Sequence, residues 1–134
     1  MFSYFCNLVA LIKATVIRSK GLFWIASRPD QALSWSQAGG SLRADIAGVW
    51  WSSMPLEKRM NYLGFIENQK EIEAGWDETF GDRRNEIVFI GQDMDISGIQ
   101  AELDKCLATD TELATAKWQS GYDDTWPVQR AYAL

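Results

Sequence analysis

Two adjacent glycines within an alternating pattern constrain the fold of this chain most strongly. Within residues 32–37, apolar and polar side chains alternate from Leu33 to Ser36, and residues 41–46 alternate in the same way on the other side of Gly39-Gly40. Strict alternation is typical of strands with one buried face, and a two-residue glycine turn joins such strands into an antiparallel hairpin. The sequence therefore predicts a sheet built around an antiparallel pair.

Two other segments have the composition of strands. Residues 16–26 are rich in β-branched, aromatic and aliphatic types, and Pro29 ends this strand because proline lacks the N–H group that a central strand needs. The run from Glu86 to Gly91 is short, apolar and unbroken. This pattern is typical of an interior strand rather than an edge strand. We therefore expect about four strands.

Two further segments have helical patterns. Residues 55–75 favour a helix that is interrupted near Gly64, and we expect one of its faces to dock on the sheet. The apolar residues of that face are Leu56, Met60, Leu63, Ile66 and Ile72. A later helix follows Asp93 and Asp95, either of which can cap it. Its apolar residues, at spacings of three and four, are Ile96, Ile99, Leu103 and Leu107.

The order of these elements predicts an α+β domain, with a mostly antiparallel sheet of about four strands and two or three helices packed on one face. The length of 134 residues fits one core. We expect residues 1–15 to form an apolar, helical N-terminal segment. Residues 16–113 would form the domain, and residues 114–134 an extended tail over its core.

Composition excludes several classes of function. The formal charge of -5 repels phosphate backbones, which argues against nucleic acid as a partner. The chain has no histidine, and Cys6 and Cys106 are too far apart for a CxxC clamp, so neither a metal site nor a redox disulfide is predicted. We expect reduced thiols and a cytoplasmic location. Lys13 ends the N-terminal apolar run too early for a membrane span, which leaves a buried helix or a membrane-associated segment.

Two long motifs carry a resemblance to a known family. Residues 16–26 and 35–40 look like the pattern "RSKG-FW-A-R … WSQAGG", and residues 81–91 look like "GDRR-E-VFIG". In these motifs the chain resembles the C-terminal domain of the CobW-type metallochaperone GTPases, which are related to CobW, HypB and UreG, in their zinc-associated branch. The resemblance covers residues 16–113.

This resemblance implies a domain that follows a P-loop GTPase domain in proteins that deliver metal, often zinc, to client enzymes or assist cobalamin synthesis. The phosphate loop, the guanine-reading motif and the CxCC metal motif of the family are absent from this sequence. The resemblance thus implies a non-catalytic accessory domain without cofactor or metal. Its partner would be a GTPase domain, in cis or in trans, or a metalloenzyme client. A stand-alone small-molecule or peptide-binding module, or a non-functional and self-associating gene fragment, is the alternative.

Several side chains are candidates for contact with a partner. Tryptophans supply large contact areas at low entropic cost, and arginines can hold a carboxylate or a phosphate. The candidate partner-contact residues are Arg18, Lys20, Trp35, Trp50, Trp51, Arg83 and Arg84. For Arg83 and Arg84 the plainer explanation is a structural ion pair, and for Arg18 and Lys20 it is a solvated strand face. Trp50 and Trp51 are consecutive, so one of them should face outward. The acidic pairs are better explained by helix caps, turns and the tail than by a metal site.

Overall fold

The computed structural model describes residues 16–115, 117–121, 123 and 124, so the predicted N-terminal helix lies outside the described residues. A four-stranded antiparallel sheet has the order β3-β2-β1-β4. The strands are β1 Val16–Phe23, β2 Gln31–Ala38, β3 Ser41–Val49 and β4 Glu86–Gly91. The helices are η1 Trp51–Ser53, α2 Leu56–Arg59, α3 Leu63–Ala74, α4 Ile96–Asp104, α5 Asp110–Ala114 and η2 Lys117–Ser120. The predicted α+β class is confirmed.

The predicted hairpin is formed by β2 and β3. Gly39 adopts a φ of 57°, which glycine tolerates better than other residues, and the turn places Trp35 opposite Ala44. Because successive side chains face opposite sides, Leu33 and Trp35 are buried while Ser36 is exposed. The alternation in the sequence thus decides which face of the sheet carries the core.

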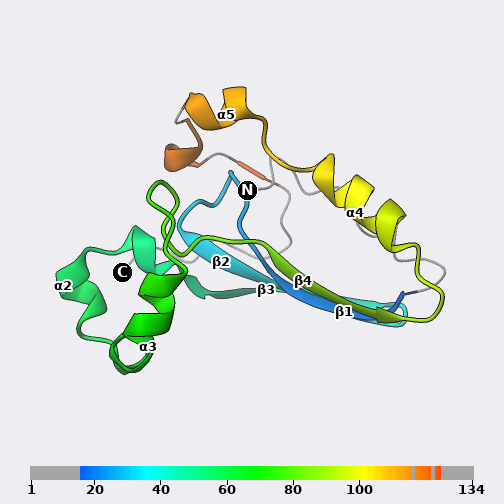
Figure 1. Cartoon of the computed structure of the whole chain (residues 1–134), viewed down its shortest axis with the longest axis horizontal. Coiled ribbons are helices and arrows are strands. Elements are labelled where there is room, and N and C mark those ends of the chain that lie inside the picture. The colour runs from blue at the N-terminus through cyan, green and yellow to red at the C-terminus, as the bar shows by residue number, and fades with distance from the viewer. Residues whose placement is uncertain (1–15, 116, 122, 125–134) are drawn as a thin grey trace.

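The core lies between this face of the sheet and α4. Phe23, Leu33 and Trp35 are buried there, and Ile99 and Leu103 of α4 pack against them. Figure 1 shows α4 and α5 over one face of the sheet, whereas α2 and α3 gather beyond one end of the strands. The opposite face of the sheet is not covered by any described helix.

The position of β4 corrects one prediction. We expected an interior strand, but β4 pairs with β1 alone and forms an edge of the sheet. Its alternate residues Ile87 and Phe89 pack toward α4, while Val88 and Ile90 are 46% and 56% exposed on the other face. The strand is apolar on both faces, although only one of them is covered by described residues.

The helical segment after β3 corrects a second prediction. Its expected docking face is largely exposed, as the side chains of Leu56, Met60, Leu63 and Ile66 show. The helix α3 is anchored instead by Phe65, which is buried against Trp51 at a ring distance of 5.2 Å. Because α3 lies beyond the strand ends, its apolar stripe does not meet the sheet (Figure 1).

Two expectations about the environment of the chain can be compared with the structure. Cys106 is disulfide-bonded, so the expectation of a reduced thiol is wrong at this position. Distance along the sequence excludes a CxxC clamp but says nothing about distance in the fold. Among the described helices, none has both the length and the apolar character that crossing a membrane requires.

Candidate functional site

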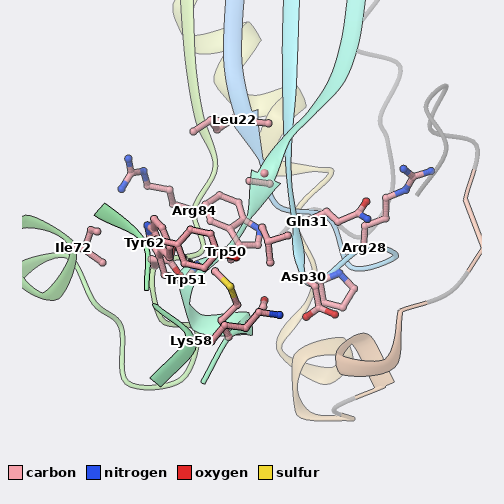
Figure 2. Close-up of a pocket in the computed structure, with 18 of the residues that line it drawn as sticks. Leu22, Arg28, Asp30, Gln31, Trp50, Trp51, Lys58, Tyr62, Ile72 and Arg84 are labelled. Carbon is pink, nitrogen blue, oxygen red and sulfur yellow. Dashed lines mark hydrogen bonds between the residues drawn. The ribbon is translucent and has the colours of Figure 1, made fainter. Parts of the chain in front are cut away.

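A pocket of about 1020 Å³ opens where β3 ends and β2 begins. Its walls come from the end of β3, from η1, α2 and α3, and from the loops at 27–30 and 82–84. Figure 2 shows the rings of Trp50, Trp51 and Tyr62 close together, with Ile72 on one side of them and Asp30 on the other. The pocket therefore combines aromatic walls with charged side chains at its rim.

An aromatic cluster forms the support behind this pocket. Trp24, Trp50 and Trp118 are buried together with Ala26 and Ala32, and Phe80 packs against them. The Trp24 ring lies 5.1 Å from Phe80 and 5.5 Å from Trp118. Aromatic pairs at such distances contribute beyond the area that they bury. This cluster holds the loops that carry the pocket residues.

Arg83 cross-links the loops around the aromatic cluster. Its guanidinium donates to the carbonyl oxygens of Pro29 and Phe80, at 2.9 and 3.1 Å, and to Ser53 Oγ at 2.9 Å. Burial lowers the pKa of Arg83, while the charges of Asp30 and Asp82 act in the opposite direction. The side chain is only 10% exposed, so Arg83 acts as a structural tie within the described chain.

Asp82 fixes the backbone of η1, which carries Trp51 in the pocket wall. Its two carboxylate oxygens accept from the backbone N–H groups of Trp51 and Ser52, both at 2.8 Å. The preceding Gly81 has a φ of 70°, and a Cβ atom there would lie 2.2 Å from the Cβ atom of Ser52. The motif at 81–84 therefore requires glycine at its first position, and Asp82 and Arg83 join three loops.

The three tryptophans among the candidate contact residues have different surroundings. Trp35 is in the core, where its Nε1 donates to Ser19 Oγ at 3.0 Å. Trp50 is 5% exposed and lines the pocket, and its buried Nε1 has no hydrogen-bond partner among the described residues. Trp51 is half-buried and lies against Tyr62 at 5.9 Å, also in the pocket wall. Trp50 and Trp51 thus reach the pocket, and Trp35 does not.

The charged candidate residues lie on two different surfaces. Arg84 is 62% exposed at the pocket rim and pairs with Glu86 at 3.1 Å. Arg18 and Lys20 are exposed on β1, on the face of the sheet opposite the core. The pocket therefore brings together Trp50, Trp51 and Arg84, whereas Arg18 and Lys20 lie on a different surface.

Sequence reasoning missed three residues of this region. Arg28 is buried and makes a two-pronged ion pair with Asp124, at 2.8 and 2.9 Å, so this part of the tail is tied to the domain. Lys58 and Tyr62 line the pocket from α2 and the turn after it. The position of Arg28 directly after a buried apolar run was the available signal, because a charged group there needs a partner.

The side chains that line the pocket suit a ligand or partner with an apolar part and an acidic or carbonyl group. Aromatic rings offer apolar contact, and Lys58 and Arg84 carry donors that suit an acidic or carbonyl group. In the ranges that the structure describes, no group of three or more acidic or cysteine side chains could hold a metal ion.

Comparison with known proteins places these features in a family. The family model described as the cobalamin synthesis protein CobW C-terminal domain matches residues 2–107. Zinc-regulated GTPase metalloprotein activator 1 of Dictyostelium discoideum is 41% identical over 117 residues, which are 85% of this chain and 23% of that protein. A zinc chaperone of Mycobacterium tuberculosis is 31% identical over 118 residues, which are 86% of this chain and 29% of that protein.

The chain thus spans about a quarter of the length of these relatives and corresponds to their C-terminal part. No solved structure matches it significantly. The motif loop at 81–84 and the segment at 16–40, which carry the resemblance in the sequence, lie within the matched range. The chain belongs to the family of CobW C-terminal domains.

Proposed function

We propose that this chain is a non-catalytic interaction domain of a CobW-like zinc chaperone system, which acts in cis or in trans with a GTPase domain. The observation that carries the proposal is the match to the C-terminal part of relatives named as a zinc-regulated GTPase metalloprotein activator and a zinc chaperone. A metalloenzyme client is the other partner that this family membership suggests. The cytoplasm is the proposed location.

The contact surface that we propose consists of the pocket rim and the apolar side chains beside it. Trp51 and Arg84 supply an aromatic wall and a charge. The neighbouring α2–α3 segment exposes further large apolar side chains, namely Leu56, Met60, Tyr62, Leu63 and Ile66. Exposed apolar patches of this kind mark protein interfaces. Arg18 and Lys20 are additional candidates on the open sheet face, whereas Trp35, Trp50 and Arg83 would act by supporting the fold.

Association with a GTPase domain tests this proposal. The whole chain is titrated calorimetrically with the GTPase domain of the Dictyostelium relative, and GTP hydrolysis and zinc transfer are followed in parallel. We expect Leu63→Arg to weaken association about tenfold or more, because it places a charge in the apolar contact. Ile96→Arg is the matched control, since Ile96 and Leu63 are 71% and 72% exposed and only Leu63 lies on the proposed surface.

The proposal fails if the wild-type chain neither binds the GTPase domain nor changes its GTP turnover or zinc transfer. The proposed contact surface is wrong if the two arginine variants weaken association equally. Trp51→Ala provides a second readout without a change in net charge, once circular dichroism shows that α3 is intact, because Phe65 of α3 packs on the Trp51 ring.

The pocket itself, with aromatic walls and the cationic side chains of Lys58 and Arg84 in its lining, favours a second candidate function, the binding of a small molecule. A small carboxylate could place its apolar part against the aromatic rings and its charge beside these cationic groups. Titration with a panel of small carboxylates should then shift the tryptophan fluorescence, and Arg84→Ala should weaken this binding because it removes a charged donor at the rim. Binding of this kind without any association with a GTPase domain would favour the second function over the first.

A further inference from the structure

No described strand pairs with the outer edge of β4, and the four central residues of β4 include no charge and no proline. Natural edges are blunted by charges, prolines, bulges or a covering loop. Between Glu86 and Gly91, β4 has only Ile87, Val88, Phe89 and Ile90, and it pairs with β1 alone among the described strands. Alternate residues of such a strand direct their N–H and C=O groups away from the sheet. This edge therefore resembles an interior strand that lacks one neighbour.

A groove of about 500 Å³ lies next to this edge, between β4 and α4. The side chains of Ile87 and Phe89 form one wall, and Ile96, Ile99 and Leu103 are on the other. A strand added beside β4 would place every second side chain on the groove side of the sheet. Its remaining side chains would lie beside Val88 and Ile90, whose exposed surfaces they would cover.

The charges around the groove favour a basic occupant. Asp104 is the charged residue among those that line it, and neither lysine nor arginine lines it. Asp93 and Asp95 lie just beyond the C-terminal end of β4. An apolar strand with a lysine or arginine near its end would therefore meet complementary charge.

We propose that the β4 edge and this groove bind an extended, alternately apolar segment of another protein by strand addition, with a basic residue of that segment near Asp104. Strand addition obtains affinity from main-chain hydrogen bonds and specificity from pockets for alternate side chains, and β4 offers both. A second copy of this chain fits less well, because each copy has a net charge of -5 and would bring another Asp104 to a groove that no cation lines. The site is separate from the pocket beside α2 and α3, so it goes beyond the function proposed above.

A synthetic peptide of about nine residues, alternating valine and threonine with a lysine at each end, tests the proposal on the whole chain. We expect saturable binding by calorimetry and slower hydrogen exchange at alternate amides of β4. Ile96→Arg should weaken binding about tenfold or more, since it puts bulk and positive charge at the groove. Leu63→Arg, an identical type of change at an equally exposed site outside the groove, should leave the affinity within about twofold.

The charge contribution has its own test. Asp104→Asn should weaken binding of the lysine-flanked peptide by about threefold and leave a serine-flanked version unchanged. A peptide of the same composition with two central prolines should not bind, because proline interrupts the ladder of main-chain hydrogen bonds.

Four results would overturn the proposal. The first is the absence of saturable binding, and the second is equal weakening by Ile96→Arg and Leu63→Arg. The third is strong protection of every β4 amide in the free chain, which would mean that a segment of the chain itself occupies the edge. The fourth is a concentration-dependent dimer that Ile96→Arg dissociates, which would identify a second copy as the occupant.

Discussion

Two consecutive arginines show how differently neighbouring residues of one motif can act. The Arg83 side chain is only 10% exposed and donates to two backbone carbonyl groups and a serine hydroxyl, whereas Arg84 is exposed and makes one ion pair with Glu86. Buried carbonyl groups lose free energy when their donor is removed, and exposed ion pairs contribute little. Arg83, which its residue type made a candidate for ligand binding, thus links the loops by hydrogen bonds.

The first prediction follows from this contrast. Arg83→Ala should lower the free energy of unfolding by about 2 kcal/mol or more, because the Pro29 carbonyl loses its donor and Phe80 and Ser53 each lose a hydrogen bond. Arg84→Ala should change it by less than about 0.5 kcal/mol. Urea unfolding followed by circular dichroism measures both values. Arg83→Lys should recover only part of the loss, since an ammonium group cannot reproduce the fork of donors, and equal effects at the two arginines would contradict this assignment.

The second prediction concerns two glycines in contrasting surroundings. Gly81→Ala should destabilise the fold by about 2 kcal/mol or more, because the new Cβ atom would overlap Ser52 and the φ of 70° disfavours alanine. Gly64→Ala should instead stabilise it by about 0.5 kcal/mol, since Gly64 is in α3 and no heavy atom lies within 4 Å of the added Cβ position. Thermal unfolding of both variants checks the opposite signs, and a loss of stability in both would refute the argument.

At the scale of single elements, α4 shows how well a local signal can be read from the sequence. The spacing of its apolar residues predicted the helix, and Asp93 and Asp95 were both possible caps. In the structure Asp95 is the cap, because its side chain accepts from the N–H group of Gly98 at 2.9 Å. Asp93 has a positive φ of 49° and lies before the helix.

The third prediction is the contribution of this cap. Asp95→Ala should lower the free energy of unfolding by about 1 kcal/mol, because the first turn of α4 loses an acceptor for its free N–H groups. Asp95→Asn should restore nearly all of it, since asparagine caps about as well. Chemical denaturation of the two variants provides the comparison. Equal destabilisation by alanine and asparagine would show that the charge, and not the hydrogen bond, is what matters.

The elements that could not be placed from the sequence share one physical cause. Alternation in β2 and β3 and the heptad-like spacing in α4 are local, so they indicate which face is buried without knowledge of the fold. The apolar run in β4 predicted a strand, but its place at the edge depends on pairing with β1, about 70 residues earlier in the chain. The apolar stripe of α3 likewise needs a neighbour, and its side chains do not identify that neighbour.

The same limit applies to the candidate site. Trp50, Trp51 and Arg84 were recognised by residue type, but their meeting in one pocket depends on the contacts of Asp82 with η1. The pairing of Arg28 with Asp124 spans 96 residues and could not be read from either position. Residue types therefore suggested binding groups, and only the fold showed which of them share a surface.

At the scale of the whole molecule, the exposed apolar surface of α2 and α3 has a consequence for behaviour in solution. A domain that leaves Leu56, Met60, Leu63 and Ile66 exposed should self-associate weakly when its partner is absent. Our fourth prediction is that the average mass of the isolated chain rises with concentration in sedimentation velocity, and that Leu63→Arg returns it to the monomer. Ile96→Arg should have no such effect on self-association. A wild-type chain that stays monomeric at millimolar concentration would contradict the prediction.

The order of the strands in the sheet also bears on how the chain is made. The meander of β1, β2 and β3 is complete at Val49, but the edge of β1 that faces β4 stays open until Glu86–Gly91 is available. At about 5–20 residues per second, a ribosome needs roughly 2–8 s to extend the chain from Val49 to Gly91. During this interval the nascent chain displays an unpaired strand edge, so co-translational chaperones would have their clearest substrate in the half-built sheet.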